Sequence, residues 1–241
     1  MAASDRRLVG NKLVLAGALV YFGEWIGIAV APSLPTDRLG ADPAATIADY
    51  GHQPGYTGFL AGWLAVVLLG RIAFCVGLRD TVRDHAAARR LADVGVAVMV
   101  VSVMVEIVGY GLVATASWLV DNGAPGAGVI AFDAANTTLF PLIIAPAGVA
   151  VLLCAAAMLI SGLYPRWLAW PGVAVGGLLA IGGIEESAAL GSSGLVHDIG
   201  YLPIPLLWLW LLLTGITVYR ARPRAAHAAG PVVSPAVEAN T

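Results

Sequence analysis

Apolar runs long enough to cross a lipid bilayer recur along this chain of 241 residues. A transmembrane helix needs about 20 mostly apolar residues to cross about 30 Å of hydrocarbon. Because a chain in lipid must satisfy its own backbone hydrogen bonds, each such run is expected to be a helix. The sequence therefore predicts an all-α, polytopic membrane protein whose six transmembrane helices form one bundle. The six expected spans are residues 13–31, 57–78, 93–119, 139–163, 168–190 and 201–219.

The composition excludes several other classes of protein. Apolar residues make up 59% of the chain, charged residues make up 12%, and the mean hydropathy is +0.84. A soluble domain carries about twice this share of charged residues. The net charge of −2 leaves no basic surface for nucleic acid. We therefore exclude a water-soluble enzyme, a disordered chain and a nucleic-acid-binding protein, and we expect membrane lipid as a partner.

The basic residues predict the orientation, because Lys and Arg near span ends stay in the cytoplasm. The loops on the opposite side carry Arg38, and Arg71 lies within a span. Both termini are therefore predicted to be cytoplasmic, with a transmembrane domain at 1–222 and a disordered cytoplasmic tail at 223–241. The other basic residues all fall on one side: Arg6, Arg7, Lys12, Arg79, Arg83, Arg89, Arg90, Arg166, Arg220, Arg222 and Arg224.

The amino-acid bias predicts the host membrane. Lys12 is the single lysine, against twelve arginines, and Ala, Gly and Val dominate the chain. This bias is typical of a high-GC bacterial genome, so we expect a multi-pass protein of the bacterial inner membrane.

Three short motifs resemble an uncharacterised family of six-span bacterial membrane proteins, a domain of unknown function. They are Ala41-Asp42-Pro43-Ala44-Ala45, Leu78-Arg79-Asp80 and Leu163-Tyr164-Pro165-Arg166-Trp167-Leu168. The resemblance covers about residues 10–222. It implies the same six-span topology, and since the family has no agreed activity, it implies no catalytic residue. In the first motif, Asp42 is also expected to cap a short helix over residues 44–50.

Ionisable residues inside the predicted spans are the strongest indication of a functional site. Each one costs about 2.5–3.5 kcal/mol at a helix centre on insertion scales, so its retention needs a reason. Glu24 and Glu106 lie at or beyond the middle of their spans, and Glu185 and Glu186 lie near the outer end of the fifth. The acids therefore gather towards the outer half of the membrane, while the bases gather on the cytoplasmic side.

Glu24 and Glu106 are the candidate acid/base residues. Tyr21 lies three residues before Glu24, and Tyr110 lies four residues after Glu106, so each phenol shares a helix face with its acid. The alternative is that both acids are hydrogen-bonded ties between helices. Arg71 has two possible roles, either extending to the cytoplasmic surface or pairing with Glu106, which would keep that acid ionised.

The remaining candidates are expected to line an acidic pocket around these two acids. They are Glu185, Glu186, His197, Asp198 and Trp208. One histidine among scattered carboxylates is a weak metal motif, and no transmembrane histidine pair or lysine is present for haem or retinal. We therefore predict neither a metal nor a cofactor.

Cysteines and glycines are expected to serve packing. Cys75 and Cys154 both fall within apolar runs and are interpreted as small apolar residues of the core, without a disulfide. Glycine pairs at four-residue spacing allow close approach of helices, and they also make a homodimer through Gly-rich faces possible. These pairs are Gly23 and Gly27, Gly58 and Gly62, and Gly172 and Gly176.

Together these features predict a membrane protein that binds a lipophilic small molecule in an acidic pocket within the membrane. A buried acid with apolar walls is sufficient for cofactor-free acid–base chemistry of the isoprenoid cyclase or isomerase type. One alternative is a small proton- or cation-coupled transporter. Another is a membrane sensor or assembly factor without catalysis. The residues alone leave open whether the protein is an enzyme.

Overall fold

The computed structural model describes residues 8, 10–30, 42–51, 54–189 and 203–221. All regular structure within these ranges is helical, which confirms the all-α class for this part of the chain. The predicted tail at 223–241 lies outside the described residues. The helices are α1 (Lys12–Val30), α2 (Pro43–Gly51), α3 (Pro54–Thr81), α4 (Ala86–Asp121), α5 (Gly126–Ser161), α6 (Arg166–Ala189) and α8 (Pro203–Arg220).

Five of these helices are long and apolar enough to cross a membrane, namely α3, α4, α5, α6 and α8. The protein is therefore a multi-pass membrane protein by the length and composition of its helices. α1 coincides with the first predicted span and has 19 residues, although it is not among these five. The sixth span thus stays a prediction.

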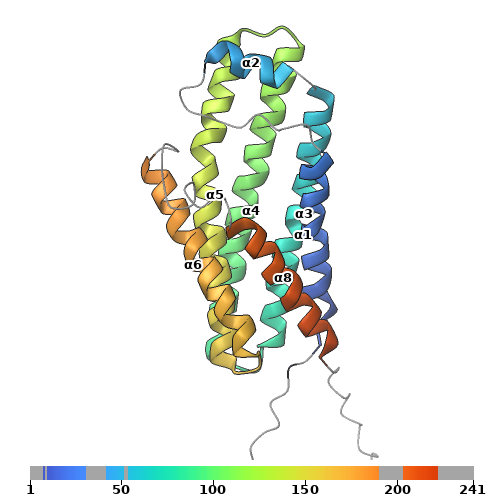
Figure 1. Ribbon diagram of the computed structural model, residues 1–241, viewed down its shortest axis with the longest axis vertical. Coiled ribbons are helices and arrows are strands. Elements are labelled where there is room, and N and C mark those ends of the chain that lie inside the picture. Colours follow the sequence, from blue (N-terminus) through green and yellow to red (C-terminus); the bar gives the residue numbers. More distant parts are fainter. Residues whose placement is uncertain (1–7, 9, 31–41, 52–53, 190–202, 222–241) are drawn as a thin grey trace, which may run out of the picture.

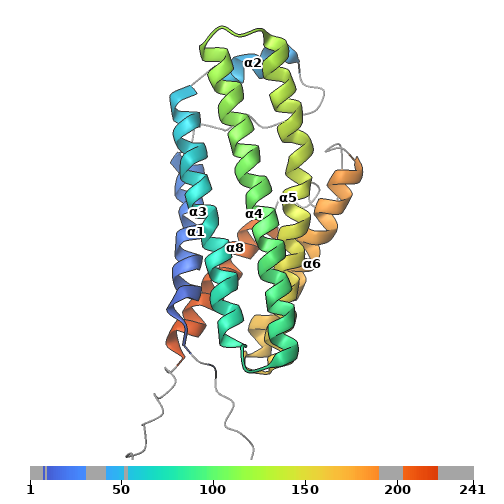
Figure 2. The same cartoon turned by 180° about the vertical axis from the view of Figure 1, so that it is seen from behind.

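Each long helix packs against the next one along the chain (Figures 1 and 2). α1 lies along α3, α3 lies along α4, and α4 and α5 form the central pair, with α6 on the far side of α5. α8 crosses from α6 towards the start of α1 and contacts both helices. The last helix therefore connects the two sides of the molecule.

One end of the molecule gathers the turns that carry basic residues. The start of α1, the α3–α4 turn, the α5–α6 turn and the end of α8 all lie at the lower end in Figure 1. This placement agrees with the grouping of Arg and Lys that the sequence analysis used, while the cytoplasmic assignment of this end stays a prediction.

The opposite end is built by α4 and α5, which extend well past the length that a bilayer requires. Each has 36 residues, or about 54 Å at 1.5 Å per residue, against about 30 Å of hydrocarbon. The fourth span, predicted to begin near Leu139, lies within α5, and the residues before it belong to the same helix. α5 is continuous from Gly126, because its first turns pack against α2 and α4 through Val129 and Phe132.

α2 covers this end, and it confirms the short helix expected after Asp42. The Asp42 carboxylate accepts a hydrogen bond from the Ala44 amide at 3.0 Å, which satisfies one free donor of the first turn. Tyr50 is buried at 1% exposure, and its hydroxyl donates a 2.8 Å hydrogen bond to Asp133 of α5. Local capping and one tertiary contact together hold α2 in place.

Glycines bring α1 and α3 into backbone contact. A Cβ on Gly17 would lie 2.4 Å from the Phe74 nitrogen, and a Cβ on Gly70 would lie 2.5 Å from the Gly17 oxygen. Such distances leave no space for any side chain, so the two helices cross at these two residues. A similar contact joins α5 and α6, where a Cβ on Gly148 would lie 2.7 Å from the Gly176 oxygen.

The predicted glycine pairs have different environments. Gly23 and Gly27 pack against α3 side chains, and Gly172 and Gly176 pack against Trp210 and the α5 backbone. At Gly58 and Gly62, an added Cβ would meet nothing within 4 Å. The pairs on α1 and α6 therefore serve packing within the chain. A homodimer through the open face of α3 stays a prediction.

We predict that Gly70→Ala separates α1 from α3 and lowers the free energy of unfolding by about 1–3 kcal/mol, as is typical of overpacking. Gly58→Ala on the same helix is the matched control, because its Cβ enters open space. That control should be neutral or stabilising by up to about 1 kcal/mol, through helix propensity. Unfolding in detergent micelles measures both changes, and equal stability of the two variants would contradict the close contact.

Candidate functional site

A buried ion pair joins α3 to α4 near the centre of the molecule. The Arg71 guanidinium donates to the Glu106 carboxylate, and the two residues are only 4% and 9% exposed. Of the two roles that the sequence left open for Arg71, the structure shows pairing with Glu106. Glu106 is therefore the carboxylate that pairs with the Arg71 guanidinium, whose proton is not given up on burial.

Glu24 of α1 lies in the same region and is 5% exposed. The Trp208 indole of α8 donates a 3.0 Å hydrogen bond to its Oε2 atom. The Tyr21 hydroxyl, one turn earlier on α1, is near enough to interact with the same carboxylate. Glu24 therefore connects the first and last helices of the described chain.

Arg71 links the two acids. Its Cζ atom lies 5.1 Å from the centroid of the Tyr21 ring, within the range of a cation–π contact. The charge of Arg71 also acts on Glu24 and on Tyr110 of α4. We call Tyr21, Glu24, Arg71, Glu106 and Tyr110 the acid–arginine cluster. The structure thus brings together the two predicted acids and both predicted tyrosines.

Aromatic rings cover the Glu24 side of the cluster. The Trp208 ring lies 4.3 Å from that of Trp25 and 6.0 Å from that of Tyr21, centroid to centroid. Trp208 was a predicted member of the site, whereas Trp25 was missed. The signal for Trp25 was its position next to Glu24, which places it beside the same neighbouring helix.

Trp210 has a different role from Trp208. Its indole donates a 2.8 Å hydrogen bond to the Leu168 carbonyl, and its ring meets Phe74 edge-on at 5.6 Å. It therefore ties α8 to α6 and α3 and stays apart from the two acids.

Glu185 and Glu186 do not join the cluster. They lie in the last turns of α6, which packs on α5 and α8. Figures 1 and 2 show α6 on the opposite side of the molecule from α1 and α3. The expectation that one of these acids shares a pocket with Glu24 and Glu106 is therefore wrong, because the helix order separates them.

Two further candidates cannot be placed. His197 and Asp198 lie outside the described residues, so their predicted part in the pocket stays a prediction. Within the described ranges, no three His, Cys, Asp or Glu side chains are grouped so that they could hold a metal ion.

A groove of about 410 Å³ lies between the start of α3 and the end of α4. Gly58, Thr115 and Trp118 are among its lining residues, and no member of the acid–arginine cluster is. The cluster instead lies among buried side chains of three helices, α1, α3 and α4.

Comparisons with known proteins add no further constraint on this site. No family model matches the sequence, and neither the curated proteins nor the solved structures contain a significant match.

We predict strong energetic coupling between Arg71 and Glu106. Each single variant, Arg71→Met or Glu106→Leu, should lower the free energy of unfolding by about 3–5 kcal/mol, because it leaves a buried charge without its partner. The double variant should cost clearly less than the sum, since no unpaired charge of this pair remains. Arg83→Met is the control, because Arg83 is exposed and such changes cost about 0.5 kcal/mol or less. Additive losses in detergent unfolding would contradict the coupling.

Proposed function

We propose that the protein is a small proton-coupled transporter of the bacterial inner membrane, in which Glu24 binds the proton. In this proposal α1, α3, α4, α5, α6 and α8 are six transmembrane helices, and both termini are cytoplasmic. The apolar length of the helices and the grouping of basic turns at one end support this topology.

The charge balance of the acid–arginine cluster carries the proposal. The cluster contains two carboxylates and a single guanidinium, and all three are at least nine-tenths buried. With both acids ionised, its net charge is −1, which is costly in a medium of low dielectric constant. Binding one proton removes this charge. Glu24 is the carboxylate that is free to bind the proton, because Arg71 donates to Glu106.

The partners of Glu24 give proton binding a structural consequence. The Trp208 indole donates a hydrogen bond to the Glu24 carboxylate, so protonation weakens this tie between α1 and α8. Arg71 also has a spare donor, since its Nε atom has no hydrogen-bond partner within the described residues. When Glu24 is ionised, Arg71 can attract it as well as Glu106, and when Glu24 is protonated, this attraction is lost. Two arrangements of α1 relative to α3 and α8 are thus coupled to one proton.

A transporter fits this geometry better than an acid–base enzyme does. A general acid must reach its substrate within hydrogen-bonding distance. Here Glu106 faces Arg71, and Glu24 faces Tyr21 and Trp208. A coupling acid needs only to change its charge and its partners. The contacts of Glu24 and of Glu106 allow both changes.

The second candidate remains an enzyme that acts on a lipophilic molecule, with Glu24 as the acid. The observation in its favour is the aromatic wall of Tyr21, Trp25 and Trp208 beside Glu24. A carbocation-like intermediate would be stabilised by such rings. This function would require α8 to move away from α1 and admit the substrate.

The topology is tested by reporter fusions. We expect a periplasm-active reporter to work at Gly123, in the α4–α5 turn, and a cytoplasm-active reporter to work after Thr241. A tail fusion that is active only outside the cytoplasm would contradict the proposed cytoplasmic C-terminus.

Proton binding is tested by infrared spectroscopy of the reconstituted protein. We expect a protonated-carboxyl band in the wild type that disappears in Glu24→Gln. The band should persist in Glu185→Gln, the matched control on α6, which lies away from the cluster. In vesicles with an imposed pH gradient, proton flux should fall to the level of empty vesicles in Glu24→Gln and remain in Glu185→Gln. An unchanged band and unchanged flux in Glu24→Gln would overturn the assignment.

A further inference from the structure

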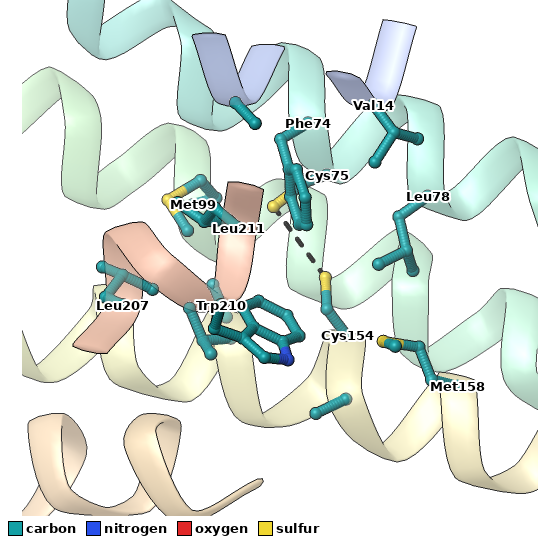
Figure 3. Close-up of a cluster of buried hydrophobic side chains, with 14 of the residues drawn as sticks. Val14, Phe74, Cys75, Leu78, Met99, Cys154, Met158, Leu207, Trp210 and Leu211 are labelled. Atoms are coloured by element: carbon teal, nitrogen blue, oxygen red, sulfur yellow. Dashed lines mark hydrogen bonds between the residues drawn. The ribbon is translucent and has the colours of Figure 1, made fainter. Parts of the chain in front are cut away.

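The two cysteines of the chain meet in the core. Cys75 of α3 and Cys154 of α5 are free thiols, 1% and 0% exposed, and their Sγ atoms lie 3.8 Å apart. Figure 3 shows the pair joined by a dashed line between the helices. They come from helices that have few other contacts with each other. The sequence analysis interpreted them as separate apolar residues, and their meeting is a product of the fold.

Two methionines add sulfur to the same region. Met99 and Met158 are buried, at 1% and 0% exposure, in the same hydrophobic cluster as the cysteines. Met158 follows Cys154 by four residues, so the two share a face of α5. Met99 lies one turn beyond Gly95, where a Cβ would be 3.2 Å from the Cys154 sulfur. In the view of Figure 3 the two methionines flank the cysteine pair.

The spacing of the thiols suits a shared metal ion. Two sulfur atoms that each lie about 2.3 Å from one ion are about 3.8 Å apart at a tetrahedral angle and about 4.0 Å apart at a trigonal angle. Zn²⁺ takes four ligands, whereas Cu(I) is satisfied by two or three sulfur atoms and is selected by thiolate and thioether donors. The cysteine pair is two ligands of this kind, and Met158, which lies beside Cys154 in Figure 3, offers a thioether as a third.

We propose that Cys75 and Cys154 bind one Cu(I) ion as thiolates, with the Met158 thioether as a third ligand. Both thiols lose their protons on binding, so two protons are released for each ion bound. The two thiolates and the ion then carry a net charge of −1. Arg71, one turn before Cys75 on α3, has a positive charge that acts on Cys75. None of the three proposed ligands belongs to the acid–arginine cluster, so copper binding can be tested apart from Glu24.

The experiment uses the full-length protein in detergent under anaerobic conditions, with its thiols shown to be reduced. Cu(I) is supplied as a complex with a coloured chelator, and transfer to the protein is read from the loss of colour. We expect the wild type to remove about one Cu(I) per chain. The double variant Cys75→Ala, Cys154→Ala should remove none. X-ray absorption of the loaded wild type should show sulfur ligands alone, at about 2.2–2.3 Å.

Two methionine variants test the third ligand. Met158→Leu, which keeps the side-chain volume, should weaken binding at least about tenfold. Met104→Leu is the matched control, because Met104 is exposed on α4 and lies outside the hydrophobic cluster that holds the cysteines. This variant should bind Cu(I) as the wild type does. Equal binding by Met158→Leu and the wild type would overturn the role of Met158.

Three results would overturn the copper site itself. The first is that copper stays with the chelator when the folded wild type is added, and also when the wild type is refolded in the presence of Cu(I). The second is uptake by the double alanine variant equal to that of the wild type. The third is nitrogen or oxygen ligation in the absorption spectrum. Size-exclusion profiles and thermal unfolding show whether each variant is folded, so a loss of binding is read only from folded protein.

Discussion

Arg71 is a guanidinium held almost entirely away from water, and the packing of four helices accommodates its charge. Glu106 comes from α4, Glu24 and the Tyr21 ring come from α1, and Trp208 of α8 completes the Glu24 side. An unpaired guanidinium in such a place would cost several kcal/mol. The relative positions of α1, α3, α4 and α8 are therefore constrained by charge as well as by apolar packing.

The glycine contacts make this arrangement possible. The acid–arginine cluster can form only if α1 and α3 approach closely, and Gly17 and Gly70 allow their backbones to touch one turn before Tyr21 and directly before Arg71. In lipid there is little hydrophobic drive for helices to associate, so close packing and polar contacts supply it instead. The same contacts set two carboxylates against a single guanidinium in the core, and this imbalance is the basis of the proposed proton coupling.

Much of the fold could be predicted from the chain, because membrane helices are encoded locally. The residues at 57–78 and 168–190 lie almost entirely within α3 and α6, and the short helix after Asp42 was expected from its cap. The first turns of α5, near Val129, pack under α2, and this tertiary contact could not be predicted from hydropathy. Glu24, Glu106, Tyr21 and Tyr110 were found because an acid in an apolar helix stands out. Trp25 was missed although it lies next to Glu24 in the sequence. The meeting of Cys75 with Cys154 was missed because apolar runs carry no sign of their neighbours.

The sequence by itself determined the helical class, the membrane-crossing length of the helices and the residues whose burial needed an explanation. These properties follow from hydropathy and charge, which are read along a single segment. Only the tertiary structure decided which helices are neighbours. This order separates Glu185 and Glu186 from Glu24, and it pairs Arg71 with Glu106. Helix order depends on contacts between residues far apart in the chain, such as Gly17 with Gly70 and Glu24 with Trp208. Periodicity within one helix cannot encode such contacts, because it specifies a face and leaves its partner undetermined.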